Sequence, residues 1–144
     1  MYGDNMQVKY YIPVLVVAAL MAGCGGKPGL RGKVVFSDDQ SPVTKGIVVF
    51  ENESDKSVAR GELDQNGNYA VSSLKANDGI APGKYRVYLT NTENYKPNPG
   101  GGLEILENTV DFKYHKPDSS GLTVDVKKST TFDFEVDRFD PSKR

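Results

Sequence analysis

Short segments rich in β-branched and aromatic residues recur along this chain between clusters of turn-forming residues. The clearest examples are residues 122–126, which read LTVDV, and residues 132–136, which read FDFEV. Apolar and polar side chains alternate in both, a period of two that is typical of a strand with one face in the core and one in water. We expect these segments to pair as an antiparallel hairpin with an apolar inner face and an acidic outer face.

Five other segments have the composition of strands, and the sequence around Gly67 has the composition of a hairpin turn. Residues 91–102 are expected to form a long irregular loop, and residues 103–107 a short strand or turn. Irregular structure follows, with one helical turn near residues 110–114. Because no helical pattern separates the strands, we predict an all-β fold, a β-sandwich of seven strands. The other predicted strands are residues 30–36, 46–51, 57–63, 69–73 and 83–90.

An apolar run near the N-terminus, residues 12–22 (IPVLVVAALMA), has 11 residues. A helix that spans about 30 Å of hydrocarbon needs about 20, so the run fits the central part of a secretory signal peptide. Residues 20–24, LMAGC, then resemble a lipobox, with small residues before a cysteine. We predict a helical signal peptide over residues 1–23, cleavage between Gly23 and Cys24, and a lipid on Cys24. The alternative is an apolar segment of the domain core with an unrelated cysteine.

Lipidation of Cys24 would anchor the mature chain in a membrane, on the periplasmic or cell-surface side. Residues 24–29 then form a lipidated, glycine-rich tether. An Asp directly after the lipidated cysteine resembles an inner-membrane retention signal. This chain has Gly25 at that position, and this difference favours the outer membrane. Translation starts at Met1 or at Met6, and the second start gives a shorter and more positive signal. Because Cys24 is the only cysteine, no internal disulfide is available and the core must stabilise the fold.

The order of several short motifs resembles the carboxypeptidase-regulatory-like, or transthyretin-like, domains of bacterial lipoproteins. This resemblance implies a seven-stranded, antiparallel, Greek-key sandwich of the prealbumin type over residues 30–138, followed by a frayed tail at residues 139–144. It implies no single activity, because such domains are mostly structural or binding modules. The motifs are residues 30–34 (LRGKV), 46–50 (GIVVF), 64–69 (DQNGNY), 82–87 (PGKYRV) and 120–124 (SGLTV).

Little in the sequence points to catalysis or to a cofactor. His115 is the only histidine, and we expect it to lie at the surface or partly packed. No cluster of ligands suggests zinc, and the acids around Gly67 lack the later ligands of a calcium loop. Hydroxyisourate hydrolases share the transthyretin-like fold and are characterised by several histidines and a C-terminal Tyr-Arg-Gly-Ser. This chain has one histidine and lacks that C-terminal sequence. The alternative is a hydrolase or ligand-processing enzyme that uses His115 with acids in loops, namely Asp38, Asp39, Glu51 and Glu53.

The formal net charge of −1 gives no basic excess for binding nucleic acid. Tyr88, Tyr95 and Tyr114 fall on outward or loop positions, where they could stack on a sugar or a partner protein. We therefore expect a lipid-anchored, non-catalytic module with a binding or structural role in the cell envelope. This role would be adhesion, envelope assembly, or binding of an envelope protein, a peptide or a glycan. The aromatic residues expected in the core are Phe36, Phe50, Tyr69, Tyr85, Phe132 and Phe134.

Overall fold

The computed structural model describes residues 26–74 and 78–143. These residues form ten strands and two short 3-10 helices, and none of their helices is long and apolar enough to cross a membrane. The fold is therefore all-β, as predicted. The elements are β1 (Leu30–Phe36), β2 (Ile47–Asn52), β3 (Val58–Glu62), β4 (Asn68–Ala70), β5 (Gly83–Thr90), β6 (Glu93–Pro97), β7 (Leu103–Asn108), η1 (Phe112–His115), β8 (Leu122–Val126), β9 (Thr130–Thr131), β10 (Phe134–Val136) and η2 (Pro141–Lys143).

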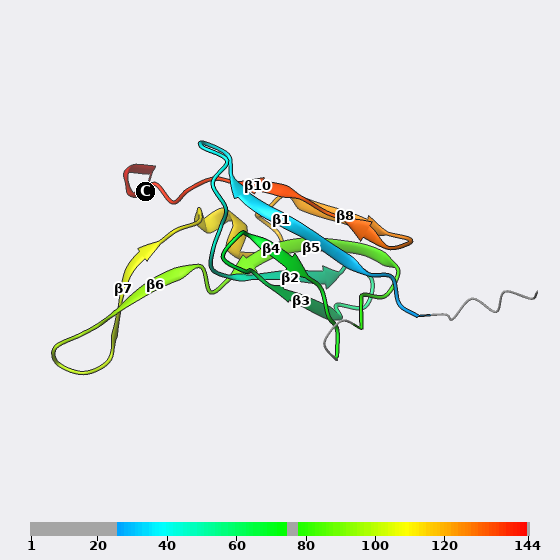
Figure 1. The fold of residues 1–144 in the computed structure, drawn as a ribbon, viewed down its shortest axis with the longest axis horizontal. Coiled ribbons are helices and arrows are strands. Elements are labelled where there is room, and N and C mark those ends of the chain that lie inside the picture. Colours follow the sequence, from blue (N-terminus) through cyan, green and yellow to red (C-terminus); the bar gives the residue numbers. More distant parts are fainter. Residues whose placement is uncertain (1–25, 75–77, 144) are drawn as a thin grey trace, which may run out of the picture.

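The strands form two layers and one separate hairpin (Figure 1). The first layer has the order β10-β1-β4, and β9 also pairs with β1. The second layer has the order β3-β2-β5-β8 and is antiparallel throughout. In the first layer, β1 runs antiparallel to β4 but parallel to β9 and β10. The prediction of seven strands in a purely antiparallel sandwich was therefore wrong in number and in direction.

The predicted C-terminal hairpin was also wrong. β8 pairs with β5 in the second layer, whereas β10 pairs with β1 in the first. The three residues 127–129 carry the chain from one layer to the other. Both segments are strands with alternating burial, but they face each other across the core instead of lying side by side.

The core lies between the two layers and joins them through aromatic side chains. The ring of Tyr69 on β4 lies 5.9 Å from that of Phe50 on β2 and 6.3 Å from that of Phe134 on β10. Five of the six predicted core aromatics are buried, and Phe132 is only partly buried. Burial of this apolar surface is the main source of stability in a chain without an internal disulfide. The buried aromatics are Phe36, Phe50, Tyr69, Tyr85 and Phe134.

The turn between β3 and β4 has the structure expected from its sequence. The carboxylate of Asp64 accepts hydrogen bonds from the backbone N–H groups of Asn66 (2.8 Å) and Asn68 (2.9 Å). Gly67 has a φ of 76°, and its carbonyl accepts a hydrogen bond from Val34 on β1. The turn is thereby joined to the first layer.

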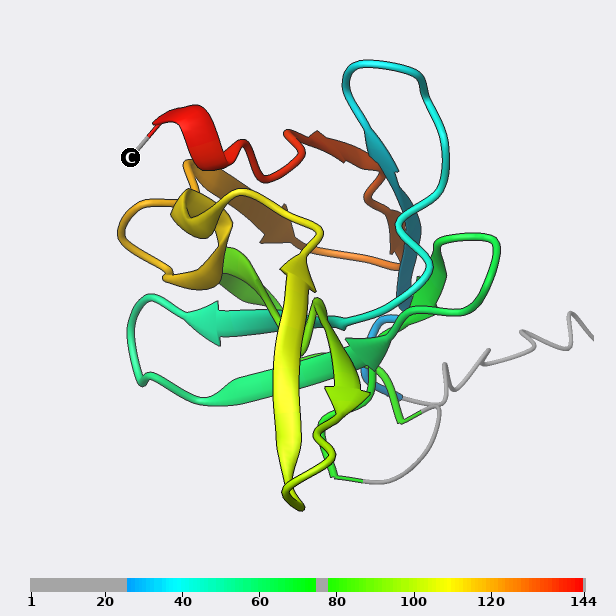
Figure 2. The ribbon, with the colours of Figure 1, turned by 90° about the vertical axis from the view of Figure 1, so that its left-hand side faces the viewer.

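The two ends of the sandwich differ (Figure 1). Residue 26 leads into β1 at one end, while the β6–β7 hairpin and the C-terminus lie at the opposite end. Figure 2 looks along the molecule from the hairpin end, with β6 and β7 in front of the second layer. The predicted long loop at residues 91–102 is therefore largely one arm and the turn of a projecting hairpin.

Candidate functional site

The β6–β7 hairpin is the most prominent projection of the described chain (Figures 1 and 2). Its register runs from Glu93 opposite Asn108 to Pro97 opposite Leu103, with a shift between Asn94 and Tyr95. Such a bulge increases the twist of a hairpin and redirects the side chains beyond it. The turn closes through a hydrogen bond from the backbone N–H of residue 98 to the carbonyl of residue 102, at 3.1 Å.

Tyr95 is the exposed aromatic residue of this hairpin, with 46% of its surface accessible. The ammonium of Lys45, in the connection between β1 and β2, lies 5.3 Å from the centre of its ring. A cation over a ring face is attracted by the ring quadrupole. This contact couples the hairpin to the sandwich and orients the ring at the molecule's surface.

The base of the hairpin is held by threonines and by His115. Thr92 is fully buried, and its carbonyl accepts a hydrogen bond from the hydroxyl of Thr109 at 2.8 Å. The hydroxyl of Thr92 lies 2.9 Å from Nε2 of His115. The ring of Phe112 meets the His115 ring edge to face at 5.6 Å. His115 is thus partly packed, as expected, and supports the hairpin from η1.

Burial lowers the pKa of His115, and the nearby charges of Glu93 and Asp111 act in the opposite direction. A lowered pKa favours the neutral imidazole at pH 7. Three of the acids suggested as its partners, Asp38, Asp39 and Glu51, contact cations elsewhere in the fold. Asp38 and Asp39 bind Arg138, with oxygen–nitrogen distances of 2.9 Å.

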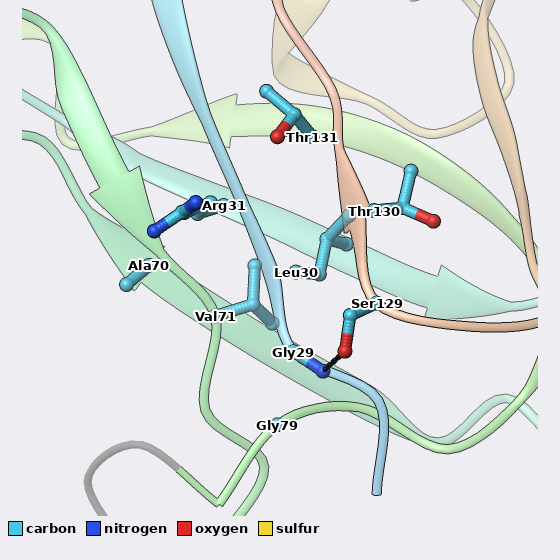
Figure 3. Close-up of a pocket in the computed structure, with 9 residues that line it drawn as sticks. All are labelled: Gly29, Leu30, Arg31, Ala70, Val71, Gly79, Ser129, Thr130 and Thr131. Carbon is cyan, nitrogen blue, oxygen red and sulfur yellow. Dashed lines mark hydrogen bonds between the residues drawn. The ribbon is translucent and has the colours of Figure 1, made fainter.

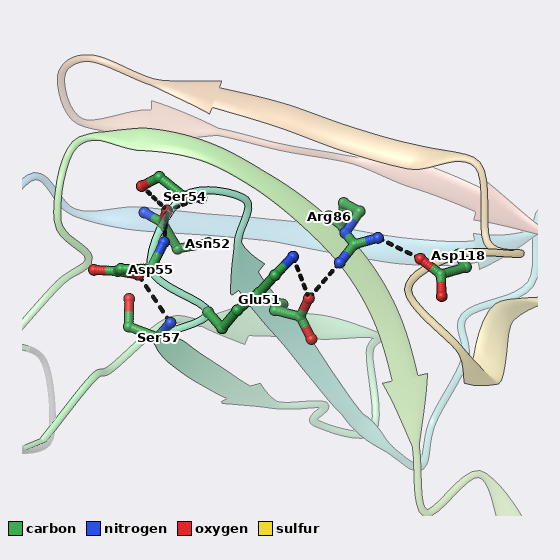
Figure 4. A network of polar contacts seen from close by, with 8 residues as sticks. Glu51, Asn52, Ser54, Asp55, Ser57, Arg86 and Asp118 are labelled. Carbon is green, nitrogen blue, oxygen red and sulfur yellow. Dashed lines mark hydrogen bonds and ion pairs between the residues drawn. The ribbon is translucent and has the colours of Figure 1, made fainter.

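Glu51 belongs to a separate polar network on the outer face of the second layer (Figure 4). Its carboxylate lies 2.6 Å from the guanidinium of Arg86 on β5 and 3.5 Å from the ammonium of Lys56. Arg86 also pairs with Asp118, which follows η1. The network therefore connects β2, β5 and the segment after η1. Nothing in the sequence indicated this network, because Arg86 is 35 residues from Glu51 and 32 residues from Asp118.

The structure separates the three tyrosines proposed as contact residues. Tyr95 is exposed, and Tyr88 on β5 is half-buried opposite Val49 of β2. Tyr114 is buried, with only 7% of its surface accessible, so the prediction that it points outward was wrong. η1 turns its ring inward, and its hydroxyl lies 3.4 Å from the carboxylate of Asp137.

Other expected sites fall outside these contacts. Gly23 and Cys24, the predicted cleavage and lipidation residues, lie outside the described residues. Within residues 26–74 and 78–143, no group of three or more histidines, cysteines and acids is placed to hold a metal ion.

Comparison with known proteins gives no family. No family model matches the chain, and no curated protein matches it in sequence. Among solved structures, it is similar to the major pilin subunit of Bacillus cereus, at 13% identity and a TM-score of 0.47. That match covers 79% of this chain but only 31% of the pilin. A 9R-lipoxygenase from Cyanothece gives a TM-score of 0.36 at 15% identity, over 75% of this chain and 16% of the enzyme. Likenesses at this level assign no function.

Proposed function

We propose that this chain is a lipid-anchored, extracytoplasmic module that binds a protein of the cell envelope through its β6–β7 hairpin. The observation that carries the proposal is the polarity of the molecule. The chain enters the sandwich from the segment after Cys24 at one end, and the hairpin projects from the other (Figure 1). An anchor at the first end would hold the hairpin away from the membrane.

The sequence before the sandwich supports the anchor. The apolar run at residues 12–22 and the LMAGC sequence fit a lipoprotein signal, and only residues 25–29 separate Cys24 from β1. Two or more acyl chains anchor a protein firmly, whereas one chain binds only marginally. Gly25 favours the outer membrane, with the domain on its periplasmic or cell-surface side.

The edges of the hairpin support a protein as the partner. Among the described strands, β6 and β7 pair only with each other. Each outer edge therefore offers backbone N–H and C=O groups to an added strand, a common mode of peptide recognition. Tyr95 adds an aromatic side chain of the kind enriched at protein interfaces. A glycan stacked on Tyr95 is the competing outcome.

The strand order supports a transthyretin-like, Greek-key sandwich. When the β6–β7 hairpin is set aside, eight of the ten strands remain and form the two layers. Several neighbours, such as β2 with β5 and β1 with β10, are joined by crossing connections.

A non-catalytic role is supported by the environment of His115. Its Nε2 is 2.9 Å from a threonine hydroxyl, and burial favours its neutral form. The carboxylates that a hydrolase would use with it, Asp38, Asp39 and Glu51, instead form ion pairs with arginines. This arrangement suits a packed base for the hairpin better than an acid–base pair.

The anchor is tested by metabolic labelling with a fatty acid. The wild-type chain should be labelled and retained in membranes, and Cys24→Ser should lose both properties. Cys24→Ser combined with Ser54→Cys, a cysteine on the exposed β2–β3 turn, is the matched control and should stay unlabelled. Labelling that survives in Cys24→Ser would refute lipidation at this residue.

The partner is tested with a photo-reactive amino acid placed at residue 95 of the full chain in living cells. A discrete protein cross-link is expected there and not from residue 65, which is exposed in the β3–β4 turn. Release of the adduct by a glycosidase and not by a protease would instead identify a glycan. Equal cross-linking from residues 65 and 95 would remove the hairpin from the proposal.

A further inference from the structure

The segment that leads from Cys24 is bound to the sandwich on two sides. The backbone N–H of Gly29 donates to the Ser129 hydroxyl at 3.0 Å, in the turn between β8 and β9. On the other side, the N–H of Ile80 donates to the carbonyl of Pro28 at 3.0 Å. Figure 3 shows Gly29 between Ser129 and Gly79, and all three line one cavity. These bonds fix which surface of the sandwich surrounds the tether.

The tether, residues 24–29, is short, so this surface of the sandwich stays close to the lipid on Cys24. A chain spans at most about 3.6 Å per residue, so the Cα atom of Pro28, the first tether residue whose backbone bonds to the sandwich, lies within about 14 Å of that of Cys24. The head-group region on each side of a bilayer is about 5 to 8 Å thick. A lipid on Cys24 would therefore keep this end of the sandwich within reach of the head groups.

An exposed leucine lies on this surface. Leu74, after β4, has 89% of its surface accessible, which is unusual for a large apolar side chain. It borders a hollow of about 230 Å³ that Lys27 of the tether also lines. Val58, with 38% of its surface accessible, lines the same hollow. Leu74 and Val58 therefore form an apolar patch next to the tether.

Basic side chains surround the same end. Lys127 and Lys128 precede Ser129 in the turn that binds Gly29, and both are exposed, as is Arg31. Of the acids at this end, Asp78 binds the Ser73 side chain and two backbone N–H groups, and Asp125 pairs with Lys127 at 3.5 Å. Glu53 and Asp55 are exposed on the β2–β3 turn. Apolar and basic side chains at one end of a molecule are the composition of surfaces that bind anionic bilayers. We call these residues the tether face: Lys27, Arg31, Leu74, Lys127 and Lys128.

We propose that the tether face docks on the anionic phospholipid surface of the membrane that holds Cys24, with Leu74 inserted at the level of the head groups. The inference rests on the proposed lipid anchor and adds an orientation to it. The sandwich would stand on the membrane with the β6–β7 hairpin directed outward, instead of moving freely on its tether.

The chain contains no tryptophan, so one introduced indole reports on a single position. The lipidated full chain carrying Leu74→Trp is reconstituted in vesicles of phosphatidylglycerol and phosphatidylethanolamine. Insertion of the indole among the head groups should shift its emission to shorter wavelength. Lipids brominated near the head group should quench this emission. Tyr95→Trp, on the hairpin, is the matched exposed control and should be neither quenched nor shifted. Adding Lys127→Gln and Lys128→Gln to Leu74→Trp should reduce the quenching.

The outcomes separate the two proposals. Protein that fails to float with the vesicles contradicts the anchor itself. Protein that floats but shows no quenching at residue 74, or equal quenching at residues 74 and 95, leaves the anchor intact and overturns the docked orientation. Quenching at residue 74 that is the same on purely zwitterionic vesicles overturns the role of the basic residues.

Discussion

The hydroxyl of Tyr69 on β4 donates a hydrogen bond of 2.5 Å to the backbone carbonyl of Phe132, 63 residues further along the chain. The bond joins β4 to the short link between β9 and β10. Burial, and to a lesser extent the charge of Asp133, raises the pKa of this hydroxyl, so Tyr69 remains a donor throughout the neutral range. The bond therefore holds the C-terminal strands on the first layer.

Tyr69→Phe should destabilise the fold by about 1–3 kcal/mol, because it leaves a partly buried carbonyl without its donor. The measurement is chemical denaturation followed by circular dichroism. Tyr95→Phe removes a hydroxyl from an exposed ring and should change the free energy of unfolding little. Equal effects of the two variants would mean that the Tyr69 bond contributes nothing specific.

Gly32→Ala should be far more damaging than Gly29→Ala. A Cβ atom at Gly32 would lie 1.9 Å from the carbonyl oxygen of Phe132, so β1 and the β9–β10 link would have to separate. Overpacking typically costs about 1–3 kcal/mol, and a clash with backbone lies at or above the top of that range. At Gly29 the nearest atom to an added Cβ would be the Ser129 hydroxyl oxygen at 3.7 Å, an ordinary contact. Thermal unfolding of both variants checks the difference, and similar melting temperatures would contradict it.

Glu51→Gln should cost about 1.5–3 kcal/mol, the range for hydrogen bonds to charged groups. The side chains of Glu51 and Arg86 are only 18% and 26% exposed, so water screens their contact poorly. Asp125→Asn breaks the exposed pair with Lys127, whose side chain is 82% accessible, and should cost less than about 1 kcal/mol. Urea denaturation of the two variants gives the comparison. A larger loss for Asp125→Asn would reverse our ranking of the two pairs.

Asp39→Asn should lower stability at neutral pH, and the difference from wild type should disappear in acid. Hydrogen bonds from Ser41, and then Arg138, lower the pKa of Asp39 from 3.8 to about 2. A carboxyl whose pKa is lower in the folded than in the unfolded state stabilises the fold at pH values above its unfolded pKa. For Asp39 this contribution is lost as the pH falls from 3.8 to about 2. Denaturation at a series of pH values measures it. Ser41→Ala should reproduce part of the effect, and a constant offset between wild type and Asp39→Asn would contradict it.

The sequence predicted most strands because their alternation records which side chains are buried. β1 and β5 begin and end at the predicted residues, and Gly67 takes the positive φ that its turn required. Alternation does not record which strand is the neighbour. Residues 127–129 are as short as a hairpin loop, yet they cross between layers, and this crossing became visible only from the pairing of Phe134 with Val34.

The parts that the sequence missed depend on contacts outside the core. The β6–β7 hairpin pairs its two strands with each other and with neither layer. Its Pro and Gly residues read as loop, although residues 103–107 were predicted as a short strand or turn. The side chain of Tyr114 was wrongly predicted to be exposed because η1 has only four residues, too few for a hydrophobic pattern that shows which face is buried. The pairing of Lys45 with Tyr95 joins residues 50 positions apart, and only the folded chain brings them together.

The position of β1 between β4 and β10 sets the order in which an exported chain can fold. In the export proposed above, β1 would be among the first parts of the domain to leave the cytoplasm, but its partner Phe134 follows Val34 by 100 residues. The first layer would therefore stay incomplete until almost the whole chain had been translocated. Contacts of such high sequence separation form slowly. Late closure would keep the polypeptide in the extended state that a secretion channel accepts, and fold it only after it has left.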